Sequence, residues 1–134
     1  MGSAGNITGW ITLFFGLYGL AAGVGEYRNP GFWSNMLGEI RASSALQFVT
    51  GIVTLALGAT IYLVNPFDPA DWLSILVTVI GGWIIIEGML ILALGDWFMN
   101  FASRLMGKEA RFWAVLAIIF SLAAIFAGLV RLQI

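Results

Sequence analysis

The chain has 134 residues, of which 60% are hydrophobic and 10% are charged, and its formal net charge is −1. Soluble domains carry about 25% charged residues, so this composition excludes an ordinary water-exposed surface and predicts a protein surrounded by lipid. The near-neutral charge gives no basic footprint for nucleic acid. Cysteine and histidine do not occur, which removes thiolate chemistry, the commonest general base and the usual metal ligands. We therefore expect no enzymatic activity, no metal and no cofactor.

Four stretches are long and apolar enough to be membrane helices, which need about 20 residues each. In chain order they are 7–25, 45–64, 72–95 and 112–130. The first is not preceded by a positively charged segment in the printed sequence, so we expect a retained span and not a cleaved signal peptide. The sequence thus predicts an all-α integral membrane protein, with residues 1–134 forming a single transmembrane domain.

The segment after the first span predicts a short helix lying in the membrane interface. Its sequence, NPGFWSNMLGEIRASS (29–44), carries apolar residues at helical spacing and is too short and too polar to span. Asn29 suits the N-cap of this helix, and Pro30 suits its first turn. A loop with aromatic anchors is the alternative interpretation.

The connection between the second and third spans, NPFDPADW (65–72), predicts a turn followed by a helix start. Asp68 can be the N-cap, Pro69 the first helical residue, and Asp71 complements the helix dipole. After the third span, DWFMNFASRLMGKEA (96–110) again has aromatic residues at helical spacing and predicts a second interfacial helix, with Asp96 as its cap.

Basic and aromatic residues predict the orientation. Five of the six lysine and arginine residues fall in segments 26–44 and 96–111, which the positive-inside rule assigns to the cytoplasm, so both termini are expected outside. Aromatic belts agree with this assignment. The residues expected at the interfaces are Trp10 and Trp72 on the outer side, and Trp33, Trp97, Phe98 and Trp113 on the inner side.

The two halves of the chain resemble each other at an offset of 65 residues. At this offset Gly16 falls on Gly81, Gly23 on Gly88, and the Phe32-Trp33 pair on Trp97-Phe98. The sequence therefore predicts a unit of helix, amphipathic segment and helix that is used twice, at about 7–64 and about 72–131. Because both copies begin outside, the two repeats are expected to be parallel.

Small residues recur along each span, many of them seven apart, which favours left-handed helix crossings with closely approaching backbones. Ordinary helix packing is the expected role of these seams, and slots for a lipid or cofactor are the alternative. The glycines expected in the seams are Gly9, Gly16, Gly19, Gly23, Gly51, Gly58, Gly81, Gly88, Gly95 and Gly128.

One carboxylate, Glu87, interrupts the apolar run GGWIIIEGMLILAL (81–94), about 12 Å from Gly95 along a helix. In one interpretation it exchanges a proton with a cation or substrate, and Trp83, one turn away, stacks on the ligand. This pairing is similar to that of small multidrug-resistance transporters, which use one membrane-embedded glutamate and nearby aromatic residues. In the other interpretation Glu87 is structural or interfacial, bonded within the chain or to another protein. The span holds no second ionisable group for a proton path, which favours the second interpretation.

The strings SALQFVTGIVTLALG (44–58) and DWLSILVTVIGGWIIIEG (71–88) resemble small four-helix bacterial inner-membrane proteins of unassigned function. The resemblance implies a bacterial inner membrane and no particular activity. From the small-residue seams and amphipathic segments we expect a non-enzymatic accessory or assembly subunit of a larger membrane complex, or a homo-oligomer. Its partners would be the lipid bilayer and other membrane-protein subunits or further copies of itself. The alternative is a small proton-coupled transporter or channel centred on Glu87.

Overall fold

The computed structural model describes residues 3–106 and 110–133, and every regular element in these ranges is α-helical. The helices are α1 (Ser3–Arg28), α2 (Phe32–Ala42), α3 (Ser44–Val64), α4 (Trp72–Met106) and α5 (Ala110–Leu132). Four of them, α1, α3, α4 and α5, are long and apolar enough to cross a membrane. This confirms the predicted all-helical fold with four such helices. Lys108, one of the basic residues used for the predicted orientation, lies outside the described residues.

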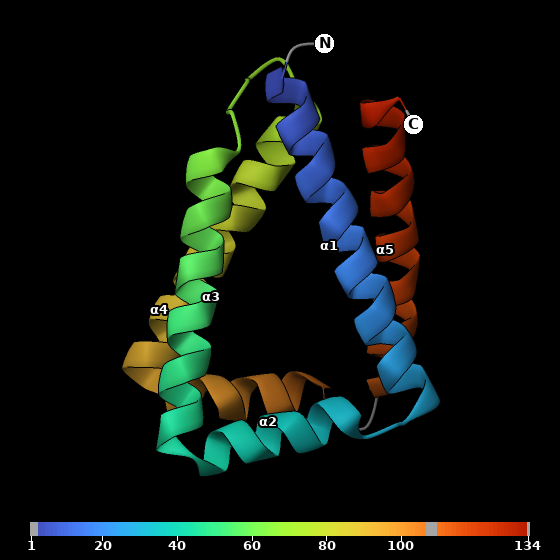
Figure 1. The fold of residues 1–134 in the computed structure, drawn as a ribbon. Coiled ribbons are helices and arrows are strands. Elements are labelled where there is room, and N and C mark those ends of the chain that lie inside the picture. Colours follow the sequence, from blue (N-terminus) through green and yellow to red (C-terminus); the bar gives the residue numbers. More distant parts are fainter. Residues whose placement is uncertain (1–2, 107–109, 134) are drawn as a thin grey trace.

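The long helices form two antiparallel pairs, α1 with α5 and α3 with α4, which hold most of the contacts between helices (Figure 1). The pairs lean together at the end that carries both termini and the 65–71 connection. They diverge toward the other end, where α2 and the last part of α4 lie across the gap between them (Figure 1). We call the narrow end the apex and the crossing segments, 32–42 and 95–106, the base.

Glycines explain why the helices of each pair approach so closely. A Cβ atom on Gly16 would lie 2.6 Å from the Ile125 side chain, and one on Gly88 would lie 2.5 Å from the backbone nitrogen of Leu55. The other glycines of the predicted seams also face the partner helix of their own pair; they are Gly9, Gly19, Gly23, Gly51, Gly58, Gly81, Gly95 and Gly128. The seams are therefore used for packing inside this chain.

The third predicted span continues directly into the second predicted interfacial segment. A kink at Leu94, with φ −133° and ψ 48°, redirects α4 into the base, and the helix runs on to Met106. A second helical segment therefore follows the kink as predicted, but no hydrogen bond in the described residues makes Asp96 its cap. Asp96 instead accepts a hydrogen bond of 3.0 Å from Nε2 of Gln47 on α3, which fixes the start of the base against the α3–α4 pair.

The first interfacial helix forms as predicted, but its cap is different. The N-cap residue is Gly31, whose φ of 98° favours glycine, and neither Asn29 nor any other local side chain caps the helix. Glu26, near the end of α1, accepts hydrogen bonds from the backbone amides of Gly31 (2.8 Å) and Trp33 (2.7 Å). A carboxylate beside the free amides of a helix start satisfies them and complements the helix dipole. The base is thereby attached to α1.

The cap of α4 also differs from the prediction. The helix begins at Trp72, and Asp71 accepts a hydrogen bond of 3.2 Å from the amide of Leu73, so Asp71 and not Asp68 is the cap. Asp68 accepts from the amide of Ala70 within the preceding turn. The predicted roles of Asp68 and Pro69 are wrong because the helix begins three residues later than the sequence pattern suggested, whereas Asp71 lies at the helix start, where a carboxylate complements the dipole.

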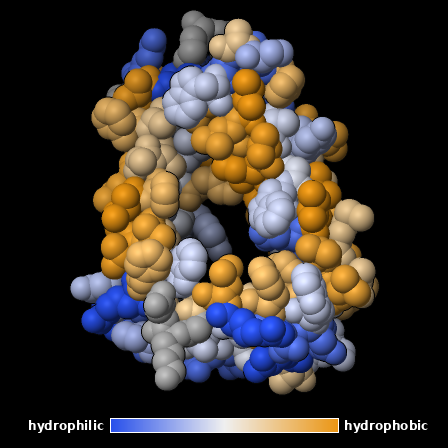
Figure 2. All heavy atoms as spheres, turned by 180° about the vertical axis from the view of Figure 1, so that it is seen from behind, coloured by the Kyte–Doolittle hydropathy of each residue, from blue (hydrophilic) through white to orange (hydrophobic). Residues whose placement is uncertain are grey.

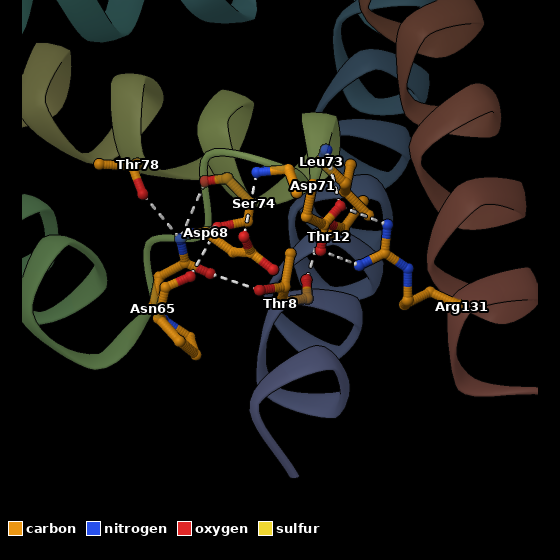
Figure 3. A network of polar contacts seen from close by, with 11 residues as sticks. Thr8, Thr12, Asn65, Asp68, Asp71, Leu73, Ser74, Thr78 and Arg131 are labelled. Carbon is orange, nitrogen blue, oxygen red and sulfur yellow. Dashed lines mark hydrogen bonds and ion pairs between the residues drawn. The ribbon is translucent and has the colours of Figure 1, made fainter. Parts of the chain in front are cut away.

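Polar side chains join the two helix pairs at the apex (Figure 3). Asn65 accepts a 2.7 Å hydrogen bond from the hydroxyl of Thr8 on α1 and donates to Ser74 and Thr78 on α4. Arg131 near the end of α5 donates two hydrogen bonds, of 2.6 and 2.8 Å, to the carboxylate of Asp71. These hydrogen bonds lower the pKa of Asp71 below its ordinary value of 3.8. At the base a matching connection exists, because Arg41 on α2 donates to Asn100 on α4.

Candidate functional site

Between the two helix pairs lies a cleft of about 680 Å³, bounded by α1 on one side and by α3 and α4 on the other. Figure 2 shows an opening between the two flanks, with hydrophobic side chains on both of them and hydrophilic ones gathered at the base. The cleft exists because the pairs meet at the apex and diverge toward the base, where α2 and the last part of α4 cross the gap (Figure 1). Its walls include Phe14, Phe15 and Tyr18 of α1, Val53, Thr54 and Leu57 of α3, and Ile84 and Glu87 of α4.

Glu87 lines this cleft in the half of the apolar part of α4 that is nearer the base, seven residues before the kink at Leu94. No hydrogen bond of standard geometry joins its carboxylate to another side chain or backbone group in the described residues. The indole of Trp83 is close enough to interact with it. Trp83 itself is 57% exposed and is not part of the cleft wall, so it borders the carboxylate from outside. The predicted pairing of these two residues on one helix face is therefore present, but only Glu87 faces the cleft.

Tyr18 and Thr54 line the same cleft, and neither hydrogen-bonds Glu87. Gln47 on α3 donates to Asp96 and to the carbonyl of Arg41 at the base. The polar groups of the cleft wall are the hydroxyls of Tyr18 and Thr54 and the carboxylate of Glu87, and the rest of the wall is apolar. This combination of a large apolar surface with a few polar groups is typical of a ligand site.

The aromatic residues predicted at the interfaces lie near the two ends of the molecule. Trp72 is the first residue of α4 and Trp10 lies about two turns from the start of α1, both toward the apex, and both are exposed. At the base, Trp97 stacks on Phe101 at 5.8 Å, and the Trp113 indole donates a 3.2 Å hydrogen bond to the carbonyl of Leu105. The other two, Phe98 and Trp33, are half-buried. A second hollow of about 470 Å³ is lined by Trp33, Trp113 and apolar residues of α4 and α5.

Sequence reasoning missed two residues that shape the cleft. Glu26 is 1% exposed and attaches α2 to α1, while Asn65 is 4% exposed and joins α1 to α4 at the apex. A signal for Asn65 was its place directly before Pro66 in a turn, where an asparagine side chain commonly bonds nearby backbone. Glu26 had no local signal, because the amides that it caps lie five and seven residues later, on another helix.

Comparison of the chain with protein-family models, with curated proteins and with solved structures finds no match. The cleft and its lining residues are therefore the basis on which a function can be assigned.

Proposed function

We propose that this chain is a non-enzymatic, multi-pass membrane protein that acts as a small proton-coupled transporter or channel, with Glu87 in the central cleft as its proton-carrying group. A bacterial inner membrane is the proposed location, with both termini outside the cytoplasm. The observation that carries the proposal is a carboxylate that lines a cleft between two helix pairs and forms no ion pair within the described residues.

Membrane insertion and orientation are supported by where the polar groups lie. Arg28, Arg41, Arg104 and Arg111 are all at the base end, on α1, α2, α4 and α5. The basic residue at the apex, Arg131, is paired with Asp71. A concentration of arginine at one end of a helical membrane protein marks the cytoplasmic side. The base segments would then lie in the inner interface.

A tandem origin of the two halves is supported by the pairing of the helices. At the offset of 65 residues α1 corresponds to the first part of α4, and α3 corresponds to α5, so the pair α1–α5 corresponds to α4–α3. Gly16 packs on Ile125, and its counterpart Gly81 packs on Ile61, within one residue of the same register. Leu94, the kink in α4, corresponds to Asn29, where α1 ends and the turn to α2 begins. We propose that the two units are parallel repeats related by an axis along the membrane normal.

The cleft favours transport over the subunit role for two physical reasons. The glycine seams, which first suggested a partner protein, are filled by helices of this chain. A charged carboxylate in hydrocarbon costs about 2.5–3.5 kcal/mol on insertion scales. Within the described residues Glu87 has the indole of Trp83 beside it but no cation that would neutralise its charge. A glutamate whose charge is neutralised in turn by a proton and by a cationic ligand avoids the cost of a charged carboxylate in hydrocarbon. It also couples the movement of the proton to that of the ligand.

The second candidate is an accessory or assembly subunit, or a homo-oligomer. It is supported by the open side of the cleft, since a partner helix at this opening would cover Glu87 and the exposed Trp83. In this case the carboxylate of Glu87 would bond the partner, and removing the carboxylate would separate the two proteins.

One pair of measurements separates the candidates. Wild type, Glu87→Gln and the control Glu39→Gln, on the exposed side of α2, are purified in mild detergent and reconstituted into liposomes that contain a pH dye. Under an imposed potassium diffusion potential, transport predicts a proton flux that Glu87→Gln abolishes and Glu39→Gln leaves unchanged, with the same assembly state in all three. Equal flux in wild type and Glu87→Gln contradicts the proposal, and a protein that co-purifies with wild type but not with Glu87→Gln favours the subunit role.

A further inference from the structure

A separate hollow of about 460 Å³ lies outside the cleft, where α1 ends and the chain turns into α2 at the base (Figure 1). We call it the α1–α2 hollow. Its lining residues on α1 follow the spacing i, i+3, i+4 and i+7, so they share one face of the helix. Gly25 keeps the hollow open, because a Cβ atom there would meet nothing within 4 Å beyond its own stretch of helix. The residues that line the hollow are Ala21, Val24, Gly25, Arg28, Asn29 and Phe32.

The polar groups of the α1–α2 hollow favour an anion. The side chain of Arg28 is exposed and forms no ion pair within the described residues, and Asn29 adds an exposed side-chain amide. None of the lining residues is acidic. The nearest carboxylate along the chain, Glu26, is 1% exposed and already accepts hydrogen bonds from two amides at the start of α2. A guanidinium without a competing carboxylate suits a phosphate group, which arginine can bind through two parallel hydrogen bonds.

The backbone at this point does not assist anion binding. Because α1 ends at Arg28, its last carbonyl groups carry a partial negative charge that disfavours an anion. The amides of Gly31 and Trp33, which could have bound one, donate to Glu26. Recognition of a phosphate therefore depends on the Arg28 side chain, and a variant of this residue tests it directly.

The rest of the α1–α2 hollow is apolar and extends away from the base. Seven residues of helix, about 10 Å, separate Ala21 from Arg28, and the segment of α1 that can span a membrane ends at Arg28. In a bilayer the guanidinium would lie at the headgroup level, while Ala21 and Val24 would lie in the hydrocarbon. A phosphate attached to a hydrocarbon chain matches both parts, whereas a soluble phosphate would leave the apolar part uncovered.

The charge of the lining residues also distinguishes between phospholipids. A choline headgroup carries a cation beside its phosphate, and the α1–α2 hollow offers no carboxylate to receive that cation. An anionic headgroup such as that of phosphatidylglycerol needs only the guanidinium, and basic pockets at the membrane interface bind acidic headgroups in this way. We propose that the α1–α2 hollow binds one anionic phospholipid, with Arg28 against its phosphate and one acyl chain along Val24 and Ala21. This inference goes beyond the proposed function, since it requires membrane insertion but no proton transport.

The test measures lipid binding to the intact chain in mild detergent by native mass spectrometry, with phosphatidylglycerol and phosphatidylcholine of the same acyl chains. Wild type is expected to bind one phosphatidylglycerol about fivefold more tightly than phosphatidylcholine, the factor that one basic residue near an acidic lipid contributes. Arg28→Gln is expected to lose this preference. Arg104→Gln is the matched control, because it removes the same charge from an exposed residue of the base that does not line the hollow, and it should keep the preference. Equal affinity of wild type for the two lipids, or an equal loss in both variants, overturns the proposal.

A second pair of variants tests the location of the lipid. Gly25→Leu fills the α1–α2 hollow and leaves Arg28 in place, so phosphatidylglycerol binding should weaken about fivefold. Gly38→Leu, on α2 and equally free of neighbours, should bind as wild type does. Unchanged affinity in Gly25→Leu overturns the location. Displacement of the lipid by inorganic phosphate, but not by chloride at the same ionic strength, would identify a soluble phosphate as the occupant and overturn the lipid site.

Discussion

Gly88 offers the sharpest test of how the α3–α4 pair is held together. A Cβ atom at this position would lie 2.5 Å from the backbone nitrogen of Leu55 and 2.7 Å from its Cα. Unbonded carbon atoms prefer separations of about 3.5–4.0 Å. Since the obstacle is backbone and cannot rotate away, the substitution Gly88→Ala must push the two helices apart by about 1 Å.

The expected magnitude follows from two opposing terms. Overpacking of this kind costs about 1–3 kcal/mol, while replacing a helical glycine by alanine returns about 0.5–1 kcal/mol. Gly82 is the matched control on the same helix, because a Cβ there would meet only the ring of Tyr62, at 3.9 Å. Gly82→Ala should therefore receive the favourable term alone, and the two variants should differ in free energy of unfolding by about 1–3 kcal/mol, the overpacking term.

Reversible unfolding in mixed micelles of a mild detergent and dodecyl sulfate, followed by helical circular dichroism, measures this difference. Gly88→Ala should unfold at a lower dodecyl sulfate fraction than wild type, and Gly82→Ala at the same or a higher one. Equal stability of the two alanine variants would refute the close approach of α3 and α4 at Gly88.

Three further predictions concern the polar groups at the two ends. Glu26→Gln places an amide group against a backbone donor of α2 and should lower the free energy of unfolding by about 1–3 kcal/mol, whereas the exposed Glu39→Gln should leave it unchanged in the same micelles. Asn65→Ala should cost about 1–3 kcal/mol in that assay, and a loss below about 0.5 kcal/mol would contradict its role in joining α1 to α4. Arg131→Gln should cost about 0.5–1 kcal/mol at neutral pH. Because the folded pKa of Asp71 is lowered, this contribution is fully present above the ordinary pKa of 3.8 and is lost as the pH falls through the folded value, so wild type and Arg131→Gln should converge in acid and a constant difference would contradict the ion pair.

Hydropathy predicted the long helices well, because insertion-competent helices are defined by local composition. The predicted span 45–64 differs from α3 by one residue at its start, and 72–95 ends one residue after the kink at Leu94. The sequence did not predict whether the chain would break or bend at that point. The first half has Pro30 and Gly31 after α1 and breaks, whereas the second half has Gly95 but no proline at this point and the helix continues through a kink.

The cleft could not be predicted from the sequence, because it depends on which helices pair. Glycine spacing indicated close packing but not that Gly16 would meet α5 and Gly88 would meet α3. Tyr18 and Thr54 were two of several side chains that could lie near Glu87, and only the divergence of the pairs brings them to one wall. The hydrogen bonds at the apex were not predicted for a related reason, because Asn65 bonds a side chain of another helix, Thr8 on α1.

The contrast between the two glutamates within the long helices is the strongest reason to assign function to one of them. Glu26 is almost fully buried and accepts hydrogen bonds from two amides at the start of α2, so its charge is compensated by the fold itself. Glu87 stands in a more apolar stretch, and within the described residues the fold provides it with a cleft and the indole of Trp83 instead of two backbone amides. A chain that satisfies one carboxylate so completely could have satisfied the other, for example with Thr54 across the cleft. The absence of such a bond among the described residues is expected if the compensating group of Glu87 is a ligand or a proton that comes and goes.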